Sequence, residues 1–160
     1  MRILNSVATF LLLFPILMGT ACDQNNPSPG NRDEGPATDN TDPMTDTLAI
    51  KIGDQQFLAN LVDNPTATAF KAMLPLTINM TELNGNEKYF DLPTSLPTNA
   101  SNPGKIIAGD FLLYGSKTLV LFYETFSTSY NYTRLGKIDN PGGLAEALGS
   151  GDVVVTIELK

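Results

Sequence analysis

The residues best suited to bind a ligand are two tyrosines and an arginine at alternate positions, Tyr130, Tyr132 and Arg134. This segment predicts a β-strand that runs to Ile138, and side chains alternate between the two faces of a strand. The three side chains are therefore expected to share one face with Gly136 and Ile138. Two aromatic rings beside a guanidinium group can hold a planar or anionic ligand by stacking and by paired hydrogen bonds. The pattern predicts a ligand-binding strip.

Arg134 also has a structural interpretation, which the sequence leaves open. It is the only arginine after residue 46. Buried arginines are nearly always paired with a carboxylate, and Glu87, Asp110 and Glu124 are available as partners. On this interpretation Arg134 closes one end of the fold and plays no part in ligand binding.

A second candidate is the polar loop around Gly85, where a glycine permits positive φ and a tight turn. The loop can present Asn84, Asn86 and Glu87 from one place. Their oxygen atoms suit calcium, but the spacing is not that of a calcium-binding loop, and a turn that caps its own backbone is favoured. We therefore predict no metal site and take Asn86, Glu87 and Tyr114 as further ligand-binding candidates.

The composition excludes several classes of site. The chain has no histidine and one cysteine, so it cannot form a Ser-His-Asp triad, a Cys-His dyad, or a metal, haem or iron–sulfur site built from these residues. The hydroxyl groups of residues 127–129 have no visible general base beside them. A net charge of −7 lacks the basic footprint that nucleic-acid binding needs. We predict neither catalytic residues nor a cofactor.

The N-terminus has the features of a targeting segment. Arg2 precedes an apolar stretch, residues 7–18, which is too short to cross a hydrocarbon layer about 30 Å thick. Small residues then lead to Cys22, and residues 1–22 resemble a bacterial lipoprotein signal, in which this cysteine becomes the lipidated first residue. The alternative is ordinary secretion with Cys22 as an unpaired thiol. Both interpretations place the mature chain outside the cytoplasm.

Residues 23–46 are predicted to form a disordered tether. They hold four prolines and six acids with one arginine, and too few apolar side chains to offset the chain entropy lost on folding. The remaining residues, 47–160, contain eleven acids and eight bases, a net charge of −3. The acidity of the chain therefore belongs mostly to the tether, and residues 47–160 are expected to form one folded domain.

The domain is expected to be mainly β. Leu48, Ile50 and Ile52 alternate with polar residues, as in a half-buried strand. Asn64 followed by Pro65 is typical of a helix start. Strands are expected near residues 48–52, 57–61, 76–80, 111–114, 119–123, 130–138 and 153–159, helices at 65–74 and 142–148, and an irregular excursion at 84–104. Many short strands with two short helices indicate a small closed β-barrel.

Several short motifs of the domain are specific in combination: Asp63-Asn64-Pro65-Thr66, Asn84 to Tyr89, Gly109-Asp110, Leu113-Tyr114-Gly115, Leu121-Phe122-Tyr123, Phe126 to Tyr130, Tyr132 to Gly136, Gly143-Leu144 and Ala147 to Gly151. With these motifs the chain resembles, from about residue 50 to residue 159, the bacterial cyclophilin-like domain family. The resemblance implies a closed barrel of about eight strands with helices capping its ends. It implies no particular activity, although some relatives are joined to flavodoxin-like domains.

Cyclophilins themselves are prolyl isomerases that use an arginine and an apolar pocket. Their Phe-His-Arg segment, and the tryptophan and histidine that line their pocket, are absent from this chain. We therefore expect an extracytoplasmic, lipid-anchored, non-catalytic domain that binds an unknown small ligand or protein partner and reaches the membrane only through its lipid. The alternatives are a prolyl isomerase acting on extracytoplasmic proteins and an accessory module of a membrane redox system.

Overall fold

The computed structural model describes residues 44–160, which form ten strands and two short helices. In chain order these are β1 (Met44–Ile52), β2 (Gln55–Val62), α1 (Pro65–Lys71), β3 (Leu76–Leu83), β4 (Glu87–Asp91), β5 (Lys105–Ile106), β6 (Asp110–Tyr114), β7 (Thr118–Phe122), β8 (Phe126–Ser127), β9 (Tyr132–Ile138), α2 (Leu144–Leu148) and β10 (Val153–Leu159).

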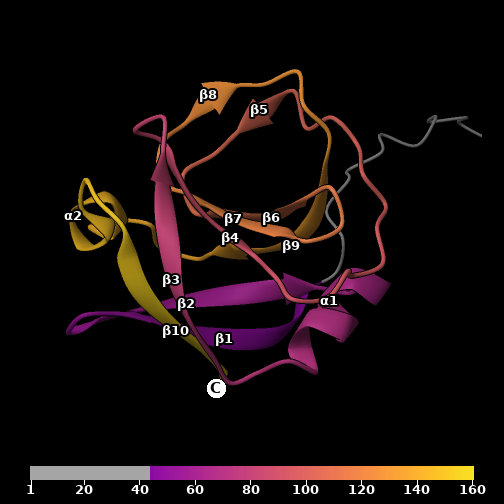
Figure 1. Cartoon of the computed structure of the whole chain (residues 1–160), viewed down its shortest axis with the longest axis horizontal. Helices are drawn as coiled ribbons and strands as arrows, with labels where there is room; N and C mark the ends of the chain where they lie inside the picture. The colour runs from indigo at the N-terminus through magenta and orange to yellow at the C-terminus, as the bar shows by residue number, and fades with distance from the viewer. Residues whose placement is uncertain (1–43) are drawn as a thin grey trace, which may run out of the picture. The chain divides into compact units, whose positions relative to one another are not determined.

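Eight of the strands close into an antiparallel barrel in the order β1-β10-β3-β4-β7-β6-β9-β2 (Figure 1). Alternation along the strands produces its core. Leu48, Ile50 and Ile52 of β1 are buried in the barrel, where Ile50 and Ile52 pair with Ile157 and Val155 of β10. Lys51, between Ile50 and Ile52, faces outward and is exposed. The expected closed barrel of about eight strands with two short helices is confirmed.

Both helices pack against the barrel core. The side chain of Asn64 caps α1 by accepting a hydrogen bond from the backbone N–H of Ala67 (2.7 Å), and Pro65 occupies the first turn. Phe70 of α1 is fully buried, with its ring centroid 5.5 Å from that of Phe111 on β6. The shorter α2 buries two leucines in the same core. Figure 1 shows the two helices on different sides of the barrel.

Strands β5 and β8 form a separate two-stranded sheet, drawn above the barrel in Figure 1. Ile106 of β5 belongs to a second apolar cluster with Leu112, Val120, Phe122 and Tyr132, which come from the barrel strands β6, β7 and β9. The residues that alternate with them along β6 and β7 belong to the barrel core, so this second cluster lies on the outer face of the barrel wall. The small sheet covers part of that face.

Strand β4 lies within the segment that the sequence predicts to be irregular, residues 84–104. It pairs with β3 on one side and with β7 on the other, so the barrel cannot close without it. The residue pattern of β4 does not indicate a strand, because the position that faces the core is occupied by a charged residue, Lys88, which is completely buried. Glu87 and Tyr89, on either side of Lys88, lie on the outer face and line a surface groove.

The register of β9 corrects the prediction that five alternate residues share one face. The pairing of β6 with β9 shifts between Gly136 and Arg134, which makes Leu135 an extra residue in a β-bulge. Tyr132 and Arg134 share a face, as expected, and pair with Tyr114 and Leu112, which lie on the outer face of β6. Gly136 and Ile138 instead pair with residues of the barrel core.

Gly136 of β9 pairs with Leu61 of β2. A Cβ atom at this position would lie 2.4 Å from the backbone oxygen of Asn60, far inside van der Waals contact. This close approach therefore requires glycine.

The first strand begins at Met44, three residues before the start predicted for the folded domain, and Asp46 forms an ion pair with Lys71 of α1 (2.5 Å). The predicted signal segment, its Cys22 and most of the predicted tether lie outside the described residues. None of the helices between residues 44 and 160 has the length and apolar character needed to cross a bilayer.

Candidate functional site

A groove of about 390 Å³ runs along the outer face of the barrel wall where β4, β7, β6 and β9 lie side by side. Its floor and walls are outward-facing side chains of these strands, completed by the turn between β3 and β4 and by the segment before β9. The lining residues are Leu83, Asn84, Glu87, Tyr89, Asp91, Tyr114, Thr118, Val120, Tyr130 and Tyr132.

Three tyrosines on β6 and around the start of β9 form a stepped aromatic surface in the groove. The ring centroid of Tyr114 lies 6.1 Å from that of Tyr130, at an interplanar angle of 90°, and 5.7 Å from that of Tyr132, at 53°. The exposed fraction is 61% for Tyr130, 47% for Tyr114 and 7% for Tyr132. The surface therefore has two accessible rings in the edge-to-face arrangement that aromatic pairs prefer, and one of them, Tyr114, also packs at a tilt against the buried ring of Tyr132.

The buried end of this surface is held firmly. Tyr132 packs edge-on against Phe122 of β7 (5.6 Å between centroids), and Phe122 contacts Phe126 of β8 (5.7 Å). The backbone of Tyr132 exchanges two hydrogen bonds with Ser101, at 3.0 and 2.9 Å. These contacts place the tyrosine rings on a wall that is already ordered before any ligand arrives.

The charged side chains that line the groove are two carboxylates on β4. Glu87 and Asp91 lie on the same face of the strand on either side of Tyr89. Asp91 accepts a hydrogen bond from the hydroxyl of Thr118 (2.6 Å). Burial raises the pKa of Glu87, and the nearby Glu82 carboxylate raises it further.

The carboxylate of Glu87 also influences the tyrosine surface. Burial raises the pKa of Tyr132, and the negative charge of Glu87 adds to this increase. Tyr132 therefore keeps its hydroxyl proton at neutral pH. The groove combines electron-rich rings with negative charge, and its lining contains neither lysine nor arginine.

Four of the six ligand-binding candidates chosen from the sequence come together in this groove: Tyr114, Tyr130, Tyr132 and Glu87. The other two do not line it. Asn86 has a buried side-chain oxygen, Oδ1, without a hydrogen-bond partner among the described residues.

Arg134 lines a different depression, which it shares with Asn64 and with residues of the 99–103 segment. Its backbone oxygen accepts a hydrogen bond from the amide of Asn64 (2.8 Å), while its side chain is exposed. None of the ion pairs within residues 44–160 includes Arg134, and its possible partner Asp110 pairs with Lys137 (3.6 Å). The described part of the chain therefore does not contain the proposed structural ion pair of Arg134.

Sequence reasoning missed Tyr89, Asp91 and Thr118 as groove residues. The available signal was the alternation of Glu87, Tyr89 and Asp91, which puts all three on one face of an extended strand. This signal was lost because the segment was predicted to be irregular. Thr118 lines the groove because β7 pairs with β4, which places Thr118 opposite Asp91.

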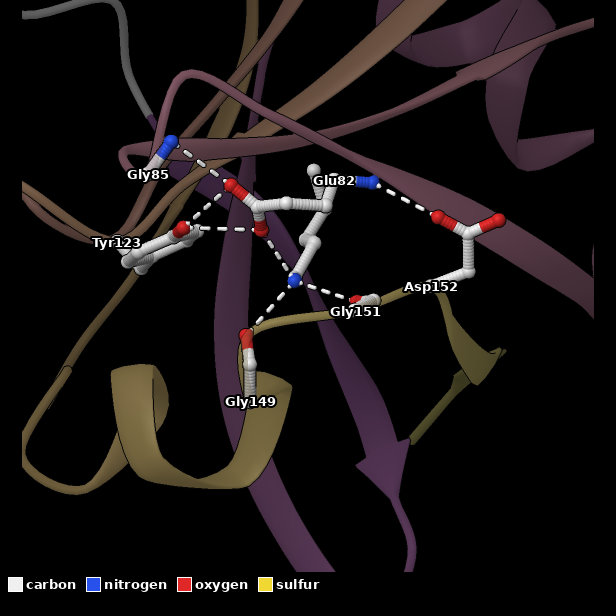
Figure 2. A network of polar contacts seen from close by, with 7 residues as sticks. Glu82, Gly85, Tyr123, Gly149, Gly151 and Asp152 are labelled. Atoms are coloured by element: carbon white, nitrogen blue, oxygen red, sulfur yellow. Dashed lines mark hydrogen bonds and ion pairs between the residues drawn. The ribbon is translucent and has the colours of Figure 1, made fainter.

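The buried cation of the described domain is Lys88. It belongs to the polar network of Figure 2, in which its partners Glu82, Gly149 and Gly151 are labelled. Its ammonium group donates to the carboxylate of Glu82 and to the backbone oxygens of Gly149 (2.8 Å) and Gly151 (2.7 Å). An ammonium group has three donors, and each of them has an acceptor here. This complete satisfaction identifies Lys88 as a structural residue that ties β4 to β3 and to the loop after α2.

Glu82 receives further hydrogen bonds from the Tyr123 hydroxyl, at 2.8 and 2.9 Å, and from the backbone N–H of Gly85 (2.8 Å). Burial by itself raises the pKa of Glu82, but the hydrogen bonds from Lys88, Tyr123 and Gly85, with the charge of Lys88, outweigh it and lower the pKa. Burial and the bond to Glu82 raise the pKa of Tyr123 to about 12. In residues 44–160 no three His, Cys, Asp or Glu side chains cluster as metal ligands would.

Comparison with known proteins agrees with this fold. The model of the Cyclophilin-like family matches residues 50–158. The solved structures that resemble the chain include the solution structure of a hypothetical protein from Archaeoglobus fulgidus, with a TM-score of 0.50 and 16% sequence identity, over 72% of this chain and 95% of that one. At this identity the likeness concerns the fold alone. No curated protein matches the sequence.

Proposed function

We propose that this chain, which belongs to the cyclophilin-like family, acts as a non-catalytic binding domain whose ligand occupies the tyrosine groove. The observation that carries the proposal is the gathering of four of the chain's five tyrosines around one groove of about 390 Å³. Small-molecule sites typically enclose about 300–1,000 Å³ and are lined by aromatic side chains with a few polar groups. Tyrosine supplies contact area at a low cost in conformational entropy.

The chemistry of the groove supports binding rather than catalysis. A nucleophilic mechanism needs a nucleophile activated by a base within hydrogen-bond reach. Tyr132 has a raised pKa and stays protonated, and the Asp91 carboxylate is engaged with the Thr118 hydroxyl. The remaining acid, Glu87, has tyrosine rings as its neighbours in the groove. This arrangement can orient a ligand but offers it no activated attacking group.

A prolyl isomerase remains the alternative activity, because aromatic grooves also dock proline-containing segments. The resemblance to cyclophilins implies that such an activity would use an arginine next to an apolar pocket. Arg134, the only arginine after residue 46, lines a separate depression beside Asn64. This separation counts against isomerase activity in the tyrosine groove.

The location of the domain is also part of the proposal. The short apolar stretch and the small residues before Cys22 support export from the cytoplasm and lipid attachment at this cysteine. A binding domain on a lipid anchor would then sample ligands or partners at the outer surface of a membrane.

The proposal is tested by screening small fragments against the ¹⁵N-labelled chain by NMR. Binding should shift signals of β4, β6, β7 and β9 around the groove. The Tyr130→Ala variant should weaken binding about tenfold, because an aromatic contact contributes about 0.5–1.5 kcal/mol beyond its buried area. Val154→Ala serves as the control, because Val154 is an exposed apolar side chain on β10, outside the groove.

Two results would contradict the proposal. Fragments that bind elsewhere and respond equally to both variants would remove the groove as the site. Acceleration of proline isomerisation in a test peptide by the unmodified chain, lost in Tyr130→Ala, would replace the non-catalytic role with the isomerase alternative.

A further inference from the structure

We infer that the ligand of the tyrosine groove is a small soluble organic ammonium ion, with its cationic head between the exposed tyrosine rings and the carboxylate of Glu87. The inference rests on the proposed function, since it names the chemical class of the ligand for that same groove. It differs from the planar or anionic ligand that the sequence predicts, because the structure separates Arg134 from the tyrosines.

The first argument is charge complementarity. The ionisable acids that line the groove are Glu87 and Asp91, and none of the lining residues carries a positive charge. The ion pairs found within residues 44–160 use Asp46, Glu82, Asp110 and Glu158. Glu87 and Asp91 are therefore carboxylates without a cationic partner in the described part of the chain.

The second argument is the partial burial of Glu87. A carboxylate that loses water without gaining a cation is poorly stabilised, which is the physical reason for its raised pKa. A bound ammonium ion would supply the missing positive charge in a setting where water screens it less than at an open surface. The groove thus gains more from a cationic ligand than from a neutral one of the same shape.

The third argument is the geometry of the rings. Tyr114 and Tyr130 stand at 90° to each other and are about half exposed, while the buried Tyr132 is tilted by 53° to Tyr114. Inclined ring faces that meet at a corner suit a cation, because the face of each ring is electron-rich and attracts positive charge. Alkylated ammonium groups are recognised in this way, with their methyl groups packed against the rings.

Other ligand classes fit less well. An anion would meet two carboxylates and no positive charge. A hard metal ion such as calcium takes six to eight oxygen ligands, and no cluster of three acids exists between residues 44 and 160. A neutral aromatic compound would stack on the tyrosines but would leave Glu87 without a partner.

The test compares two probes by NMR titration of the full-length chain at pH 7. Choline carries a trimethylammonium group, and 3,3-dimethylbutan-1-ol has the same shape with a carbon atom in place of the charged nitrogen. We expect choline to bind in the groove and the alcohol to bind at least about tenfold more weakly. Phosphatidylcholine vesicles form a third arm, and a preference for vesicles over free choline would overturn the assignment to a soluble ligand.

The decisive variant is Glu87→Gln, which keeps the shape of the side chain and removes its charge. It should weaken choline binding about tenfold and leave the affinity for the neutral alcohol unchanged. Glu146→Gln is the matched control, since Glu146 is an exposed acid on α2 and does not line the groove. It should change neither affinity.

Acidification should also weaken choline binding to the unmodified chain. Glu87 becomes neutral as the pH falls through its pKa, which lies above the ordinary value of 4.5, so the loss should begin at a higher pH than for an ordinary glutamate. Equal binding of the two probes, or an unchanged choline affinity in Glu87→Gln, would overturn the inference. If choline fails to bind while neutral fragments occupy the groove, the ammonium assignment falls and the proposed binding function stands. If no probe or fragment reaches the groove, both fall.

Discussion

Replacing Lys88 by methionine should destabilise the domain by about 3–5 kcal/mol, the usual cost of removing one partner of a buried ion pair. Methionine keeps most of the length of the side chain and deletes only the ammonium group. The Glu82 carboxylate would lose its cation, and the backbone oxygens of Gly149 and Gly151 would lose their donor. The main cost is the Glu82 carboxylate, whose side chain is only 19% exposed and would be left without its cation.

A matched control isolates the effect of burial. Lys51 also forms an ion pair, with Glu158, but the exposed fractions of these two side chains are 45% and 37%, against 0% for Lys88. Exposed pairs contribute about 0–1 kcal/mol because water screens them and two long side chains must be ordered. Lys51→Met should therefore change the free energy of unfolding by less than about 1 kcal/mol.

The assay is urea unfolding of the parent chain and both variants at pH 7, with the midpoint and the slope measured separately. Domains of this kind have about 5–15 kcal/mol of stability, so the predicted loss is a large part of the total. The double variant Lys88→Met with Glu82→Gln should recover part of the loss, since no charge is then stranded. A Lys88→Met variant that loses no more stability than Lys51→Met would refute the reasoning.

The pH dependence provides an independent check of the same network. The pKa of Glu82 is lowered on folding, so its ionised form stabilises the native state at pH values above the ordinary pKa of 4.5. This contribution is lost as the pH falls through the lower pKa of the folded state. In Lys88→Met the hydrogen bond and the charge that help to lower the pKa are gone, so this acid-dependent loss should be smaller.

Two further predictions concern the contact between β9 and β2 and the membrane anchor. Gly136→Ala should destabilise the domain by about 1–3 kcal/mol or more, because the new Cβ would lie 2.4 Å from the Asn60 oxygen, whereas Gly151→Ala, with open space around it, should be nearly neutral in the same urea titration. Cys22→Ser should move the protein from the membrane fraction to the soluble extracytoplasmic fraction, and an unchanged distribution, or no fatty-acid labelling of the unmodified chain, would contradict lipidation.

The barrel could be predicted because most of its strands have a local residue pattern that is typical of a strand. Leu48, Ile50 and Ile52 occupy alternate positions and are buried in the core, and the Asn64-Pro65 pair begins α1 as expected. These features depend on neighbouring residues alone, which is the kind of information that a sequence contains.

The parts of the fold that the sequence prediction missed depend on pairing between residues far apart in the chain. Strand β4 was missed because its inward residue Lys88 is charged. Its burial depends on Glu82 of the neighbouring strand β3 and on the distant backbone oxygens of Gly149 and Gly151. No local pattern indicates that two hydrogen-bond acceptors of a buried ammonium group come from a loop about 60 residues away along the chain.

The candidate site could be predicted in part for a similar reason. Alternation correctly placed Tyr132 and Arg134 on the same face of β9, but it gave no information about which neighbours lie beside each of them. Tyr132 pairs with Tyr114 of β6 and faces the groove, whereas Arg134 lies near Asn64 at a separate depression. The residues that lie beside a given side chain on a sheet are set by the order of the strands, and the sequence of one strand does not contain that order.

Strand β4 links the stability of the barrel to the character of the groove. Its inward residue Lys88 is bound to Glu82 and the loop after α2, while its outward residues Glu87 and Tyr89 line the groove. The network therefore fixes the position of the groove's acidic edge. It also acts on the charge of that edge, because the Glu82 carboxylate raises the pKa of Glu87. The inner face of β4 therefore carries Lys88, a cation paired with Glu82, and stabilises the barrel. Its outer face carries Glu87, which has no cationic partner among the described residues and lines the groove. The outer carboxylate is the one left available to a ligand.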